Sequence, residues 1–147
     1  MGIDQAEPEV LVDKSKREER VELGQIAVNV NRLDRAVKFY KENLGLEFLF
    51  QLPGMAFFNC AGVRLMLSLP EAGTERTGNS ILYFRVADID AKTQKLKERG
   101  TIFKAAPHRV ARMEDHELWM AFFEDSEGNP MALMSEVRDT GMGGDPT

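Results

Sequence analysis

The chain has 147 residues and a formal net charge of −5; 43% of its residues are hydrophobic and 29% are charged. This composition is typical of one globular domain, and the acidic balance argues against nucleic-acid binding, which requires concentrated Lys and Arg. No apolar run approaches the roughly 20 residues of a membrane span, so we expect no membrane partner.

The two ends of the chain lack apolar periodicity. Residues 1–21 and 138–147 are therefore expected to be flexible tails around a single domain over 22–137. The polar N-terminus does not resemble a secretory signal peptide, and the single cysteine, Cys60, has no partner for an internal disulfide. Both features indicate a cytoplasmic protein.

An alternating strand begins the predicted domain near residue 23. The residues on its apolar face are Ile26, Val28 and Val30. Asn31 is then a plausible N-cap, and apolar residues at helical spacing predict a helix over 33–44 that Gly45 ends. This helix is expected to cover the apolar face of the strand.

Two later segments share one plan, which predicts two β-hairpins. Each runs from paired aromatic residues through a glycine-containing turn into an alternating strand: FFNCAGVRLML at 57–67 and FFEDSEGNPMAL at 122–133. Gly62 and Gly128 supply the positive φ that such turns usually need. Strands over 46–52 and 55–60 lead into the first of these turns.

The second half of the chain repeats the first after a polar linker over 70–79. A strand over 81–86 is followed by a helix over 88–99, which Gly100 ends, and by a strand over 101–106. An irregular basic loop over 105–116 then leads to a strand over 116–123. The pattern predicts two copies of one strand, helix and three-strand unit.

Two segments carry a likeness to a known family. GQIAVNVNRLDRAVKFYKENLGLEF and WMAFFEDSEGNPMALM resemble the two halves of the vicinal oxygen chelate superfamily, which includes glyoxalase I, extradiol dioxygenases and bleomycin resistance proteins. The resemblance implies an α+β fold of two βαβββ modules, about 22–70 and 80–137, that form an open eight-stranded cup with helices on its outer face. It also implies a homodimer.

Metal-dependent members of this family hold an ion with four side chains. The matching residues here are Gln25, Met66, Ile81 and Ala132, of which only Gln25 offers a suitable ligand atom. The resemblance therefore implies the fold without the metal mechanism. We expect neither a metal ion nor another cofactor.

Strand alternation predicts which residues line the cup, because residues two apart share a face. With Gln25 facing inward, the lining comprises Gln25, Ala27, Asn29, Met55, Phe57, Asn59, Arg64, Met66, Ser68, Ile81, Tyr83, Arg85, His116, Met120, Phe122, Ala132 and Met134. Methionine and aromatic walls with a few polar groups are typical of a small-molecule pocket. The same methionines could instead fill the cup as core.

Several polar residues suggest chemistry beyond binding. His116 is a candidate general base, with Tyr83 or Arg85 polarising an oxygen, although an ordinary hydrogen-bonded histidine is the simpler interpretation. Arg109 and Arg112 make the neighbouring loop basic, which fits either a gate for an anionic group or a solvated loop. Trp119 has the opposite parity to His116 and is expected to lie beneath a helix.

Three functions remain open from the sequence. The first is a metal-free protein of the resistance or sequestration type that binds a small hydrophobic or aromatic molecule. The second is an enzyme: a cofactor-free lyase or isomerase using His116, or a glyoxalase-like or dioxygenase-like enzyme if the metal alignment is shifted. The third is an interaction module whose cup is filled by its own side chains.

Overall fold

The computed structural model describes residues 21–70 and 79–138. Apart from Val21 and Arg138, the predicted tails lie outside these residues, and so does the predicted linker apart from Pro70 and Asn79; Arg138 ends the last strand rather than beginning a tail. The first module contains β1 (Gln25–Asn29), α3 (Leu33–Lys38), the π-helix η1 (Phe39–Asn43), β2 (Glu47–Leu52), β3 (Met55–Cys60) and β4 (Val63–Ser68). The second contains β5 (Leu82–Arg85), α4 (Ile89–Glu98), β6 (Ile102–Arg112), β7 (His116–Glu124) and β8 (Pro130–Arg138).

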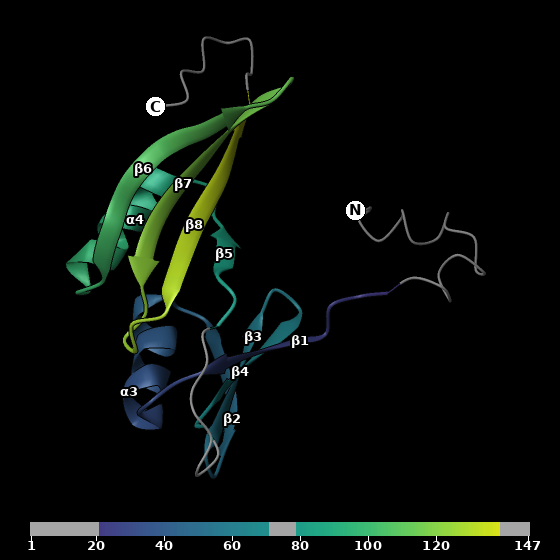
Figure 1. Cartoon of the computed structure of the whole chain (residues 1–147), viewed down its shortest axis with the longest axis vertical. Coiled ribbons are helices and arrows are strands. Elements are labelled where there is room, and N and C mark those ends of the chain that lie inside the picture. The colour runs from purple at the N-terminus through teal and green to yellow at the C-terminus, as the bar shows by residue number, and fades with distance from the viewer. Residues whose placement is uncertain (1–20, 71–78, 139–147) are drawn as a thin grey trace, which may run out of the picture.

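The two modules form sheets with the same strand order. Sheet A has the order β1-β4-β3-β2 and sheet B the order β5-β8-β7-β6, with the first strand of each module parallel to the last (Figure 1). Ala27 pairs with Met66 in sheet A as Tyr83 pairs with Ala132 in sheet B. The predicted duplication and the α+β fold of two βαβββ modules are thus confirmed, with two open sheets and no closed barrel among the described strands.

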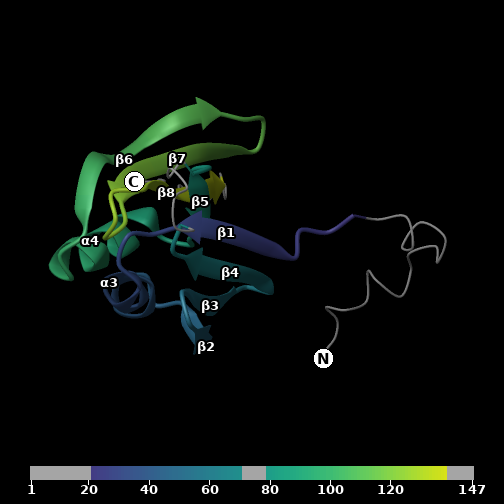
Figure 2. The same ribbon diagram turned by 60° about the horizontal axis from the view of Figure 1, so that its bottom comes forward.

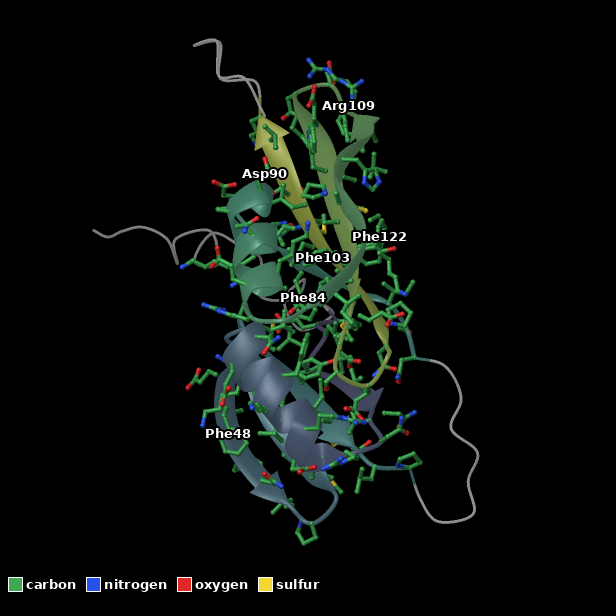
Figure 3. The ribbon with its side chains drawn as sticks, turned by 90° about the vertical axis from the view of Figure 1, so that its left-hand side faces the viewer. Phe48, Phe84, Asp90, Phe103, Arg109 and Phe122 are labelled. Atoms are coloured by element: carbon green, nitrogen blue, oxygen red, sulfur yellow. The ribbon has the colours of Figure 1, made fainter. Side chains whose placement is uncertain are left out.

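One face of each sheet is buried by a helix. The core joins residues of both modules, including Val28 and Tyr40 from the first and Phe123 and Leu133 from the second. Figure 3 shows the two helices on one side of the molecule, with Phe103 between α4 and sheet B. We call the opposite face of each sheet its open face. No helix within the described ranges is long and apolar enough to cross a membrane.

The first predicted helix has the expected extent but an unexpected second half. α3 continues into η1, where the π-helical turn buries both Phe39 and Tyr40. Their rings meet edge to face, with centroids 5.5 Å apart. Gly45 follows with a φ of 77°, so a residue without a Cβ ends the helix as predicted. The second predicted helix, α4, is capped by the Asp88 side chain, which accepts from the Ala91 amide.

The predicted cap of the first helix is wrong. The N-cap position is Arg32, and neither it nor Asn31 caps the helix with its own side chain. Instead the amides of Asn31 and Arg32 donate to Glu127 Oε1 at 2.8 and 2.9 Å. Glu127 belongs to the β7–β8 turn, so the second module caps the first helix of the first module. A local sequence pattern cannot reveal a capping carboxylate that lies 95 residues away in the sequence.

This turn, residues 125–129, joins the modules and is called the latch turn. Arg35 donates to both oxygens of Glu127, at 2.7 Å from Nε and 3.0 Å from Nη2. Beside it, the buried Tyr40 hydroxyl donates to Asp125 Oδ2 at 2.7 Å. Asp125 Oδ1 accepts from the amides of Glu127 and Asn129, which closes the turn. The latch turn therefore fixes how the two modules sit against each other.

The predicted basic loop over 105–116 is also wrong. β6 continues to Arg112 as a strand that pairs with β7, with three register irregularities along its length. Pro107 lies within it, which β6 tolerates because it is an edge strand of sheet B. Proline and clustered basic residues suggested a loop, whereas long pairing with β7 makes this segment part of the sheet.

Candidate functional site

The open faces carry the residues that the sequence assigned to the cup. In β1, Val28 is buried whereas Gln25 and Ala27 are exposed. In the second module, Leu82 and Phe84 pack against the core, whereas Ile81, just before β5, and Tyr83 are exposed. Gln25 and Ile81 therefore lie on equivalent faces, as the alignment of the modules requires.

The open face of sheet A presents an aromatic and methionine row. Phe50, Phe57, Met66 and Ala27 lie side by side across its four strands. The rings of Phe50 and Phe57 stack with centroids 4.5 Å apart, and the Arg64 guanidinium lies 6.0 Å from the Phe57 centroid. Phe50 was not among the residues predicted for this face, because a register shift between Phe48 and Phe50 alters the simple alternation in β2.

The neighbouring rows of sheet A are more polar. Asn59 pairs with Arg64, which in turn pairs with Gln25 at the edge, and Asn59 Nδ2 donates to Glu47 Oε1 at 3.1 Å. On the other side of the aromatic row lie Met55, Ser68 and Asn29. The backbone amide of Asn29 donates to Asn79 Oδ1 at 3.0 Å. Sheet A thus combines one apolar row with polar groups at both sides.

The open face of sheet B also carries a pair of aromatic rings. Tyr83, Ala132 and Phe122 lie side by side, and the Tyr83 and Phe122 rings meet edge to face with centroids 6.4 Å apart. Ala132 between them is fully buried. Figure 3 shows Phe122 on the side of sheet B away from α4.

The next row of sheet B places two methionines beside these rings. It comprises Arg85, Met134, Met120 and His108. The His108 ring lies 6.2 Å from the Phe122 centroid, and Arg85 forms a 3.9 Å ion pair with Glu136. Flat rings with flexible thioethers beside them suit a hydrophobic or aromatic ligand.

His116 shares the parity of this face but stands apart from it. His116 pairs with Arg138 at the far end of β7. Along β7 it lies four residues from Met120, a distance of roughly 13 Å at strand spacing. The structure therefore does not bring His116 together with Tyr83 or Arg85. Its Nδ1 lies 2.7 Å from Asp115 Oδ1, and Asp115 also accepts from Arg138 at 2.6 Å. The contact with His116, followed by the charge and hydrogen bond of Arg138, lowers the pKa of the Asp115 carboxyl.

Arg109 and Arg112 of β6 do not lie on the open face. Arg109 and Arg112 bind Glu117 Oε2 at 3.2 and 3.0 Å, and the indole of Trp119 donates to Glu117 Oε1 at 3.0 Å. The hydrogen bond from Trp119, followed by those from the two arginines, lowers the pKa of Glu117. This cluster lies on the helix side of sheet B, as predicted for Trp119. Both arginines are thus paired with Glu117, and Figure 3 shows Arg109 at one end of the sheet; the gate for an anionic group stays a prediction.

A groove lies at the seam between the modules, where β5 comes beside β1 (Figure 2). One part, about 250 Å³, is lined by apolar residues of both modules, and a wider part of about 570 Å³ adjoins it. Four predicted cup residues lie along this groove: Ile81, Tyr83, Arg85 and Met134. The groove also includes residues that the sequence did not predict, because only tertiary packing brings their segments together: Leu44, Cys60, Val63 and Lys92. The meeting of Phe57 and Met66 with Met120 and Phe122 in one cup stays a prediction.

The four family metal positions do not provide a metal site. Met66 offers a soft sulfur, and Ile81 and Ala132 offer no lone pair, so Gln25 would be the single oxygen donor among them. In the described ranges, no group of three or more His, Cys, Asp or Glu side chains is placed to hold an ion. The donor set does not fit the metal chemistry of the family.

Comparison with known proteins identifies related folds. The family model described as Glyoxalase/Bleomycin resistance protein/Dioxygenase superfamily matches residues 22–133. No curated protein sequence matches the chain. Among solved structures, a member of this superfamily from Sphaerobacter thermophilus DSM 20745 is 26% identical, with a TM-score of 0.65 over 80% of this chain and 99% of that chain.

Two further structures show how varied the proteins of this fold are. Lactoylglutathione lyase from Agrobacterium tumefaciens is 21% identical, with a TM-score of 0.65 over 79% of this chain and 94% of that chain. An integron cassette protein from the mobile metagenome of V. cholerae is 16% identical, with a TM-score of 0.65 over 79% of this chain and 95% of that chain. At these identities the likeness concerns the fold alone.

Proposed function

The chain belongs to the Glyoxalase/Bleomycin resistance protein/Dioxygenase superfamily, and on that premise we propose that it binds a small hydrophobic or aromatic molecule without a metal ion. The role is that of a resistance or sequestration protein in the cytoplasm. The observation that carries the proposal is the open face of sheet B. There Tyr83 and Phe122 meet edge to face beside Met120 and Met134, while the metal positions hold Ile81 and Ala132.

We also propose that the binding cup is shared between two copies of the chain. Both open faces carry large apolar side chains that the single chain leaves exposed: Phe50 is 43%, Leu52 47% and Tyr83 47% exposed. Pairing sheet A of one copy with sheet B of another would bury these side chains around the ligand. Sedimentation of the purified protein should give the mass of a homodimer; a monomer at all concentrations would contradict the shared cup.

A panel of hydrophobic aromatic compounds tests ligand binding. A compound that binds only the folded state raises the melting temperature, and a ligand on sheet B also changes the fluorescence of nearby Tyr83. Phe122→Ala should weaken binding roughly tenfold, because it removes the ring that faces the ligand. Val110→Ala, which shortens an exposed apolar side chain at another position, is the matched control. Unchanged fluorescence and melting temperature across the panel would contradict the proposal.

One observation favours an enzyme as the second candidate. The Asp115 carboxylate orients His116 at 2.7 Å, an arrangement that a general base in a lyase or isomerase could use. In that case His116→Ala should abolish turnover of a bound compound while leaving its affinity unchanged. Equal turnover in the variant would remove this candidate.

A further inference from the structure

The seam groove meets the open face of sheet B at its β5 edge, where Tyr83, Arg85 and Met134 belong to both, but its lining does not include Phe122 or Met120. Its two parts share Cys60, Val63, Tyr83 and Phe84, so they form one continuous depression. The first module contributes the end of the β3–β4 hairpin, and the second contributes β5, β8 and α4. Figure 3 shows Phe84 near the junction of the two modules. The wider part, about 570 Å³, falls within the roughly 300–1,000 Å³ of small-molecule sites.

The lining changes character along the groove. The narrower part is enclosed mainly by aliphatic and aromatic side chains, among them Ile26, Leu65, Leu82 and Phe84. The wider part carries two cations, Arg85 and Lys92. Of these, Arg85 has Glu136 as an acidic neighbour at 3.9 Å. An apolar depression with positive charge at one end matches a ligand that is itself apolar with a negative end.

Lys92 is the more informative of the two cations. It is half-buried on α4, and within residues 21–70 and 79–138 no carboxylate forms an ion pair with its ammonium group. Burial, followed by the charges of Arg99 and Lys95, lowers the pKa of Lys92. A partly desolvated cation without an acidic partner gains most when an anion reaches it.

We propose that the seam groove binds an apolar carboxylate, such as a medium-chain fatty acid, with its chain in the narrower part and its carboxylate at Lys92. This site shares Tyr83, Arg85 and Met134 with the proposed binding surface on sheet B, but it extends into the seam between the modules and does not include Phe122. A carboxylate supplies the charge that Lys92 lacks, and the apolar walls favour burial of the chain. Phosphate or a short polar anion would leave those walls exposed to water.

The single cysteine of the chain provides a reporter for this groove. Cys60 lies in the wall of both parts, and burial raises the pKa of its thiol. Modification by a thiol reagent at fixed alkaline pH therefore measures access to the groove. Decanoate below its micellar concentration is the probe, and decanol is its uncharged counterpart of equal chain length.

We expect decanoate to slow Cys60 modification at least fivefold and to raise the melting temperature. Decanol at equal concentration should have a much smaller effect on both quantities. Lys92→Gln should weaken decanoate binding roughly tenfold. Lys97→Gln, which makes the same charge change in the last turn of α4, should leave it unchanged. Phe122→Ala should also leave it unchanged, which separates this site from sheet B.

Several outcomes would overturn the proposal. Equal protection by decanol, or equal decanoate affinity in Lys92→Gln, would show that no anion is recognised at Lys92. Loss of decanoate binding in Phe122→Ala would place the carboxylate on the open face of sheet B. Absence of Cys60 protection at saturating decanoate would show that the groove is not a binding site.

Discussion

The two hairpin turns of this duplicated fold have the same plan and opposite environments. The β3–β4 turn, at Ala61 and Gly62, is exposed, and the Asn59 side chain supports it by accepting from the Gly62 amide. The latch turn is buried. Its Glu127 and Asp125 side chains bind residues of the other module. One copy of the hairpin only reverses the chain, whereas the other also holds the modules together. The seam groove depends on that arrangement.

The largest expected effect is at Glu127. Glu127→Ala removes the acceptor for the Asn31 and Arg32 amides, which directly precede α3. It also removes the partner of Arg35, which binds the fully buried Glu127 side chain at 2.7 Å. The free energy of unfolding should fall by about 2–4 kcal/mol. Urea titration followed by tryptophan fluorescence measures it. A loss below the error of the titration would show that the latch turn does not hold the modules.

The pH dependence of stability should have the same origin. Burial acts to raise the pKa of Glu127, but hydrogen bonds from Arg35, the Arg32 and Asn31 amides and Ser126 outweigh it and lower the pKa from 4.5 to about 2. Because the folded state holds the proton less tightly, the stabilisation is present above pH 4.5 and is lost as the pH falls towards 2. In Glu127→Gln the difference in unfolding free energy between pH 6 and pH 3 should shrink; an unchanged difference would assign the acid sensitivity to other carboxyls.

A smaller effect is expected at Tyr40. Its hydroxyl donates to Asp125, and burial, followed by the Asp125 charge, raises the pKa of Tyr40 well above its ordinary value. Tyr40→Phe keeps the ring in the core and removes this hydrogen bond together with a weaker contact to the Met131 sulfur at 3.8 Å. It should cost roughly 1–2 kcal/mol of unfolding free energy. Thermal unfolding of the variant checks this value, and an unchanged melting temperature would mean that the bond adds no net stability.

The smallest effect is expected in the exposed turn. Asn59→Ala removes the contact to the Gly62 amide and the bond to Glu47, both at exposed positions. The cost should stay below about 1 kcal/mol. This variant is the counterpart of Glu127→Ala in the other copy of the hairpin. If both variants lost equal stability under urea, the two turns would not differ in the way described here.

The repeat made much of this fold predictable. Alternation and glycine positions gave the strand faces of β1 and β5 and the helix ends at Gly45 and Gly100. The errors arose where distant residues decide the structure. Glu127 caps α3 from the other module, and pairing with β7 turns a proline-containing basic segment into the long strand β6. The seam groove and its Lys92 likewise depend on how the modules pack, which local patterns do not specify.

The proposed metal-free binding surface is tested most directly by isothermal titration. A hydrophobic aromatic ligand found by thermal shift is titrated into protein dialysed without chelator, and into protein treated with chelator and dialysed again. The account predicts equal affinity and stoichiometry in both preparations, because Met66, Ile81 and Ala132 cannot hold an ion. Binding that disappears after chelation and returns with one equivalent of a divalent metal ion would contradict it.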